Sequence, residues 1–348
     1  MPTSSDRSEE WSILRTVYSD PQYECATHSD LPDFVLTDGS GRQPWGVEVT
    51  EMFRSESEAR AIHHPDYLTR LFNGGQHMHR DDTITLRVET VIVHHNDGTQ
   101  HSVQSIVTPD EPIRVRYERL ADVIRTKATR PYQSGLRHVS LIIRDRYDLR
   151  GDKQKRYSVS TLMDCRVREA LLASPFHEVY WITVIAETNE QVYRPLRLLM
   201  IFEQFWLFCH GLDTWHPNPD DLMPQDAVLL FAHYCTRSGI EVRLWFMRGK
   251  LWVLHKGVAI GLGEKGTEIL DNREYVVPDD QTRQSSEGDP LLTDDQFASA
   301  SAYFNNNGFS TEYYDRAATS ANLRYPAVTA VRLKLLEDND EGAEETAT

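Results

Sequence analysis

Apolar residues recur along the chain with two periods, and the changes between them mark the elements that the sequence predicts. Residues 8–18 carry apolar side chains at helical spacing, so we expect a first helix there. Residues 33–36 and 45–52 read as two β-strands, because apolar and β-branched residues dominate them. The small residues of 38–41, Asp-Gly-Ser-Gly, suit a hairpin turn between these strands.

The core pattern is interrupted after this hairpin. Residues 53–79 are polar and rich in histidine, and two further strands are expected at 83–93 and 102–107, joined by an Asn-Asp-Gly turn at 96–98. We interpret about 53–113 as an insertion into the core fold. The elements expected after it are a helix at 115–130, a strand at 139–143, a helix at 162–173 and a strand at 179–186.

The pattern changes again near residue 189. Beyond it we expect two helices, at 196–211 and 225–238, and then a string of short strands at 241–270. A polar linker at 278–295 and a short helix at 295–305 follow. The predicted fold class is α/β, with a mixed sheet flanked by helices and an inserted β-hairpin. The expected parts are a first domain at 8–190, an α+β C-terminal unit at 191–335 and a disordered acidic tail at 336–348.

The composition limits what the protein can bind and where it works. A formal net charge of −16 with 40% apolar residues fits a soluble globular chain without a broad basic surface. Any contact with nucleic acid must therefore be local. The start of the chain lacks the apolar run of a secretory signal, and residues 196–212 are interrupted by charges and too short for a membrane span. The cysteines form no CxxC pair, so we expect a cytoplasmic protein with reduced thiols.

Two carboxylates of the first hairpin carry the main chemical signal. Asp33 stands at the start of one strand and Glu48 in the middle of its partner. Because side chains alternate along a strand, Glu48 and Thr50 point to one face and Val49 to the other. Two carboxylates and the backbone carbonyl of Val49 suit Mg²⁺, which fills its remaining positions with water and substrate phosphate. We therefore expect a divalent-metal site on this hairpin.

This arrangement resembles the PD-(D/E)XK, or restriction-endonuclease-like, superfamily. The resemblance is carried by Pro32-Asp33, by Glu48-Val49-Thr50 and by the order helix, hairpin, helix and strand over about 8–186. It implies a restriction-endonuclease-like fold and an endonuclease that hydrolyses nucleic acid with Mg²⁺ or Mn²⁺, DNA more than RNA, with Asp33 and Glu48 binding the metal. It also implies an acidic helix residue, for which Glu10 is a better candidate than Glu24. A homodimer and a role in defence or DNA processing would suit this chemistry.

The lysine of the family motif is missing, because Thr50 stands in its position. That lysine orients the attacking water and stabilises developing negative charge, which a threonine cannot do. Some members of the superfamily supply the lysine from the next helix, and Lys127 is the first lysine in the chain. On the apolar side of its helix, beside Arg130 and Tyr132, it would need a carboxylate partner. We therefore predict that Lys127 is the migrated catalytic lysine.

Other interpretations remain open. Carboxylates without the motif lysine would also suit a catalytically inactive binding or scaffold module, and the C-terminal unit could instead sense a ligand. The histidines at 63–64, 77–79 and 94–95 lack metal-site spacing, so we expect them in exposed loops rather than in a zinc site. The Gly-x-Gly-x-x-Gly match at 261–266 opens no helix and predicts no nucleotide cofactor.

Overall fold

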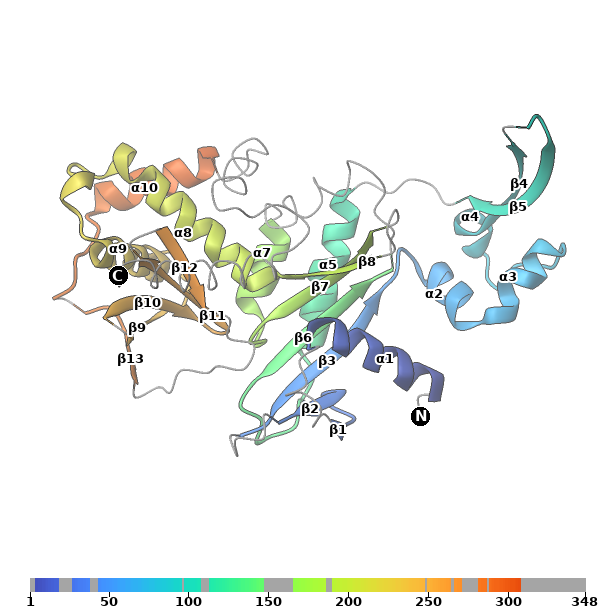
Figure 1. Ribbon diagram of the computed structural model, residues 1–348, viewed down its shortest axis with the longest axis horizontal. Helices are drawn as coiled ribbons and strands as arrows, with labels where there is room; N and C mark the ends of the chain where they lie inside the picture. Colours follow the sequence, from blue (N-terminus) through green and yellow to red (C-terminus); the bar gives the residue numbers. More distant parts are fainter. Residues whose placement is uncertain are drawn as a thin grey trace, which may run out of the picture.

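The computed structural model arranges the chain as a central sheet with the insertion on one side and the C-terminal unit on the other (Figure 1). The predicted turn at 38–41, Glu24 and the acidic tail at 336–348 lie outside the residues that the structure describes. The described residues are 4–18, 27–37, 43–95, 97–107, 113–146, 165–185, 190–247, 249–263, 266–270, 281–286 and 288–307.

The central sheet is mixed and has six strands, in the order β1-β2-β3-β6-β7-β8. β2 pairs antiparallel with β3, as the predicted hairpin requires. β3, β6 and β7 run parallel, because a helix crosses over between each strand and the next. The mixed sheet flanked by helices is thus confirmed. The strands are β1 (Thr27–His28), β2 (Phe34–Leu36), β3 (Trp45–Met52), β6 (Val139–Asp145), β7 (Val179–Ile185) and β8 (Glu190–Pro195).

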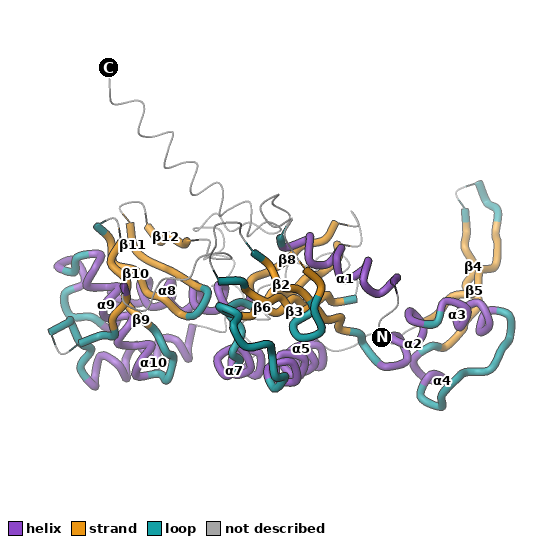
Figure 2. Tube along the Cα trace, turned by 90° about the horizontal axis from the view of Figure 1, so that it is seen from below, coloured by secondary structure: helices purple, strands orange, loops and turns teal. Residues whose placement is uncertain are grey.

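The two faces of the sheet are covered by different helices. α1 (Ser4–Val17) lies on one face, while α5 (Ile113–Ala128) and α7 (Cys165–Ala173) lie on the other (Figure 2). Val47 and Val49 are buried in the core that α1 completes, whereas Met52 is buried with residues of α5. Glu48 lies between the two valines in β3, so its side chain points toward the α5 face.

The insertion folds as a small lobe with its own apolar core of Ala61, Tyr67, Leu71 and Leu86. The expected second hairpin is present, and it extends away from the lobe as a two-stranded ribbon (Figure 1). Helices form where exposed loops were expected. The elements are α2 (Glu56–His63), α3 (Pro65–Phe72), α4 (Asp82–Thr85), β4 (Arg87–His94) and β5 (Gln100–Val107).

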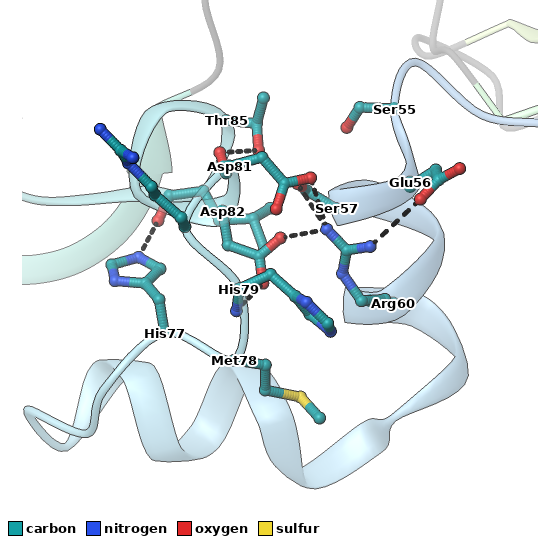
Figure 3. Close-up of polar contacts among 12 residues, drawn as sticks. Ser55, Glu56, Ser57, Arg60, His77, Met78, His79, Asp81, Asp82 and Thr85 are labelled. Atoms are coloured by element: carbon teal, nitrogen blue, oxygen red, sulfur yellow. Dashed lines mark hydrogen bonds and ion pairs between the residues drawn. The ribbon is translucent and has the colours of Figure 1, made fainter.

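A buried carboxylate, Asp82, joins the helices of this lobe (Figure 3). Arg60 of α2 donates hydrogen bonds of 2.7 Å to Asp82 and to Asp81, and the hydroxyl of Tyr67 also donates to Asp82. Burial acts to raise the pKa of Asp82, but its hydrogen bonds, led by the one from Arg60, outweigh burial and hold the pKa below its usual range. The ring of His77 contacts a backbone carbonyl of the lobe. These side chains therefore serve to fold the lobe.

The C-terminal unit is built around α8 (Leu196–Trp215), a helix whose side chains are buried on nearly every face. Its core is continuous with the core on the α5 face of the central sheet. No helix within the described ranges has the length and apolarity to cross a membrane. The other elements are α9 (Pro224–Arg237), α10 (Asp294–Asn307), a short 3₁₀ helix (Pro219–Asp221) and a sheet ordered β12-β11-β10-β9-β13, comprising β9 (Arg243–Met247), β10 (Lys250–His255), β11 (Val258–Gly263), β12 (Gly266–Leu270) and β13 (Thr282–Arg283).

The start of α8 is held by a carboxylate from the central sheet layer. The preceding residue, Pro195, makes no side-chain cap. Instead Glu178 accepts the backbone N–H of Arg197 at 2.8 Å and that of Leu198 at 3.1 Å. A negative charge at a helix N-terminus also interacts favourably with the helix dipole. The contact of Glu178 with α8 therefore joins the central sheet layer to the C-terminal unit. The central sheet itself extends through β8 to Pro195, past the expected domain end at 190.

Candidate functional site

The Pro-Asp segment is held against β3 at a residue without a side chain. A Cβ atom on Gly46 would overlap the ring of Pro32 and would lie 2.9 Å from the Cδ1 atom of Leu136. Glycine thus lets the segment before β2 lie close against the partner strand. The backbone N–H of Gln133 donates to the carbonyl of Leu31 at 3.1 Å, which ties the same segment to the chain that follows α5. The two segments that carry the predicted site are therefore fastened together.

The side chain of Asp33 adds one hydrogen bond to the pairing of β2 with β3. Its Oδ2 atom accepts the backbone N–H of Val49 at 2.7 Å, just beyond the last backbone pair of β2 and β3. Burial, followed by the negative charge of Glu48, raises the pKa of Asp33 to about 6, against the opposing effect of the Val49 hydrogen bond. The two carboxylates predicted to bind metal are thus close enough to repel each other.

Glu48 is fully buried and carries two cations on one oxygen. Its Oε1 atom accepts from Lys127 Nζ at 2.7 Å and from Arg130 Nη1 at 2.9 Å. Its other oxygen, Oε2, is also buried, and it has no hydrogen-bond partner among the described residues. A buried carboxylate oxygen without a donor is costly unless something else binds it.

The C-terminal end of α5 brings both cations to Glu48. Lys127 lies in the last turn of α5, and Arg130 lies just after the helix ends. The carbonyl of Lys127 accepts the N–H of Arg130 at 3.2 Å and the hydroxyl of Tyr132 at 2.9 Å, so this turn is capped. Burial, and then the charge of Glu48, raise the pKa of Tyr132 above its usual value. Tyr132 therefore stays neutral and fixes the backbone that carries Lys127.

Thr50 occupies the position of the motif lysine, and it lines a groove. The groove has a volume of about 410 Å³. Thr50 and Lys127 both contribute to its wall, so it lies beside the residue that contacts Glu48. Its wall also includes the apolar residues Met52, Phe53 and Val123 and the charged residues Arg119, Glu51, Glu56 and Asp122.

Glu10 lies near the carboxylate pair but is engaged elsewhere. Its Oε2 atom is 3.1 Å from the Nε2 atom of His28, on β1. Its charge still contributes to raising the pKa of Asp33, which indicates that the two acids are neighbours. Across the part of the chain that the structure describes, no three His, Cys, Asp or Glu side chains gather into a metal site. A metal here would therefore depend on Asp33 and Glu48, with Glu10 at most bridged through water.

The residues present fit a divalent ion that keeps several waters. Mg²⁺ is usually bound by one or two carboxylates together with water and substrate phosphate. A cation between the two carboxylates would bind the Oε2 atom of Glu48, for which the described ranges hold no donor, and would relieve the repulsion felt by Asp33. In a strand the N–H and carbonyl of one residue point to the same edge, so the Val49 carbonyl faces the side on which Asp33 binds its N–H. Asp33, Glu48 and the Val49 carbonyl thus remain the candidate donors.

Sequence reasoning brought together most of this cluster but missed two of its contacts. The role of Arg130 as a second cation on Glu48 was not predicted, although its position three residues after Lys127 was the available signal. The pairing of His28 with Glu10 had no signal, because it joins a two-residue strand to a helix. Comparison of the chain with protein-family models, with curated proteins and with solved structures finds no match.

Proposed function

We propose that this protein is a divalent-metal-dependent nuclease with a restriction-endonuclease-like core, acting on the phosphodiester bonds of nucleic acid, DNA more than RNA. The observation that carries the proposal is the 2.7 Å contact between Lys127 Nζ and the buried Glu48. A lysine from the helix after the hairpin reaches the carboxylate whose own strand lacks the motif lysine. The chain order α1, β2, β3, α5 and β6 supports the same proposal.

Each residue of the cluster has a role in this proposal. Asp33, Glu48 and the carbonyl of Val49 would hold Mg²⁺ or Mn²⁺, and Glu10 would assist through water. The ion, when bound, supplies a Lewis acid that activates water and neutralises charge on the phosphodiester. Lys127 would stabilise the negative charge that develops on the substrate, because its ammonium group is held beside the metal-binding carboxylate.

The surroundings of the cluster suit a local contact with a nucleic-acid strand. The groove beside Thr50 and Lys127 gives a strand an approach to the site. Arg119 and Lys127 are the cations of its wall, which Glu51, Glu56 and Asp122 also line, so a phosphate contact there would be confined to the two cations. A local approach is needed because the chain carries a net charge of −16. Cleavage of both strands of a duplex would require a second active site, and we propose that a homodimer supplies it.

The test combines metal binding with cleavage. Mn²⁺ titration by calorimetry and cleavage of DNA duplex, single-stranded DNA and RNA are measured for the wild type, Glu48→Gln and Lys127→Ala. Lys250→Ala is the matched control, because Lys250 pairs with Glu268 in the other sheet. Glu48→Gln should lose Mn²⁺ binding. Lys127→Ala should keep it while cleavage falls by about 10² to 10³-fold, and the control should behave as wild type.

Two results would contradict the proposed nuclease, and a third would contradict the role of Lys127 in it. Mn²⁺ binding without cleavage of any of the three substrates would favour a catalytically inactive binding or scaffold module. If the protein shows no Mn²⁺ binding that requires Asp33 and Glu48, nuclease chemistry at this site is excluded. Cleavage that is unchanged in Lys127→Ala would leave the metal site standing and remove the role of the lysine.

A further inference from the structure

Two cations share one oxygen of Glu48, and they differ in how firmly they are held. The side chain of Lys127 is 12% exposed and belongs to α5, whereas that of Arg130 is 42% exposed and follows the end of the helix. Both donate to Oε1, although Oε2 is buried and has no partner in the described part of the chain. The arrangement therefore leaves Oε2 for a further ligand. Oε1 accepts from two cations, although one cation would balance the single negative charge of Glu48.

Formal charges show what a divalent ion would change. Asp33 and Glu48 bring two negative charges, and Lys127 and Arg130 bring two positive ones. A divalent ion bound to the same carboxylates would leave an excess of positive charge within a few ångströms, where cations repel one another. The more exposed cation can leave at the smaller cost, because it regains water and loses a contact that solvent already screens. That cation is Arg130.

A phosphodiester supplies the negative charge that the metal-loaded site would lack. A guanidinium group binds two phosphate oxygens with its planar fork of donors, which an ammonium group cannot do. Arg130 lies three residues after Lys127, so the same turn presents both groups to whatever occupies the site.

Resting on the proposed nuclease function, we propose that Arg130 is a phosphate-binding residue that exchanges partners. It neutralises Glu48 in the metal-free protein and moves to the substrate phosphate when a divalent ion binds the carboxylates. Lys127 stays on Glu48 through both states. The metal and Arg130 therefore compete for Glu48, and the metal makes Arg130 free for substrate.

The test compares Arg130→Gln and Arg130→Lys with Arg125→Gln, a matched control in which an exposed arginine of α5 loses its pair with Asp122. Mn²⁺ affinity is measured by calorimetry without nucleic acid. We expect Arg130→Gln to bind Mn²⁺ about two- to fivefold more tightly, the change expected from removing one partly exposed competing ion pair. The control and Arg130→Lys, which keeps the charge, should match the wild type.

A second measurement follows the binding of labelled DNA in Ca²⁺, which replaces Mn²⁺ to prevent cleavage. Arg130→Gln should weaken this binding and reduce the salt dependence by about one counterion, because one phosphate contact is lost. Arg130→Lys should restore part of the affinity. Thermal unfolding of each variant checks that the fold is retained.

The outcomes separate this inference from the nuclease proposal. A wild type that binds Mn²⁺ and cleaves DNA, with an Arg130→Gln variant that behaves like Arg125→Gln in both assays, would overturn only the exchange by Arg130. Weaker Mn²⁺ binding in Arg130→Gln would also overturn it, since Arg130 would then support the metal site. A wild type without Mn²⁺ binding or cleavage would overturn both.

Discussion

Replacing Asp33 by asparagine should stabilise the metal-free protein at neutral pH while it removes a proposed metal ligand. The pKa of Asp33 rises from an ordinary 3.8 to about 6 in the folded protein, first through burial and then through the charge of Glu48. The folded state therefore binds this proton more tightly than the unfolded state does. The resulting loss of stability is absent below about pH 4, grows as the pH rises toward about 6, and is constant above that.

The magnitude follows from the same shift. A difference between 3.8 and about 6 corresponds to about 3 kcal/mol. Because the carboxyl is partly exposed, solvent screening reduces this to about 1 to 2 kcal/mol. Asparagine avoids the cost, since it carries no charge and its Oδ1 atom can still accept the N–H of Val49.

The assay is denaturant unfolding of the wild type and Asp33→Asn in EDTA, from about pH 4 to about pH 8. Asp122→Asn, at an exposed carboxylate of α5, is the control. Saturating Mn²⁺ should then stabilise the wild type and leave Asp33→Asn unchanged. The reasoning is refuted if Asp33→Asn gains nothing over the wild type between low and neutral pH, or if the wild type becomes relatively more stable as the pH rises.

Three further substitutions test how the fold supports the cluster. Gly46→Ala should lower stability by about 1 to 3 kcal/mol and weaken Mn²⁺ binding, because the new methyl group displaces Pro32 and with it Asp33; unchanged Mn²⁺ affinity in calorimetry would contradict this. Tyr67→Phe should raise amide hydrogen exchange across residues 56–107 and lower the stability of the lobe by about 1 to 3 kcal/mol, because the Tyr67 hydroxyl donates to Asp82 and accepts the N–H of Met78. Exchange that rises equally in the central sheet would show that the lobe is not a separate unit. Glu178→Gln should lower the thermal midpoint, at a cost of about 1 kcal/mol, because it removes the negative charge at the start of α8; a higher midpoint would exclude this capping role.

The sequence predicted the central sheet well where side-chain alternation is strong. β3 begins and ends at the expected residues, and β6 and β7 follow their apolar runs. The edge strand β8 was missed because its residues, Glu190–Pro195, include charged and polar ones that a pairing partner on one side can tolerate. The helices of the insertion were missed because their apolar residues, which form the small core around Tyr67, are few and stand among many charged and histidine residues.

The site was predicted in part for a similar reason. The positions of Asp33 and Glu48 follow from local strand geometry. The contact of Glu48 with Lys127 was inferred from the lack of any earlier lysine and from the apolar face of α5. The contact with Arg130 spans 82 residues and depends on where α5 ends relative to β3. Such a distance is set by packing, which a pattern of residue types does not contain.

Three acids of this chain, Asp82, Asp33 and Glu48, show why the hairpin cluster differs from a structural one. Asp82 is surrounded by donors, and its hydrogen bonds hold its pKa below the usual range despite burial. Asp33 has a pKa raised by burial and by a neighbouring acid, and Glu48 keeps a buried oxygen to which no described residue donates.

A cluster that served only stability would resemble the first case, because replacing poorly satisfied buried charges by apolar residues is often neutral or stabilising. Costs of this kind are expected where a ligand, once bound, supplies the missing charge. The stabilisation that we predict for Asp33→Asn is therefore also a test of function, since a structural acid would lose stability in the same experiment.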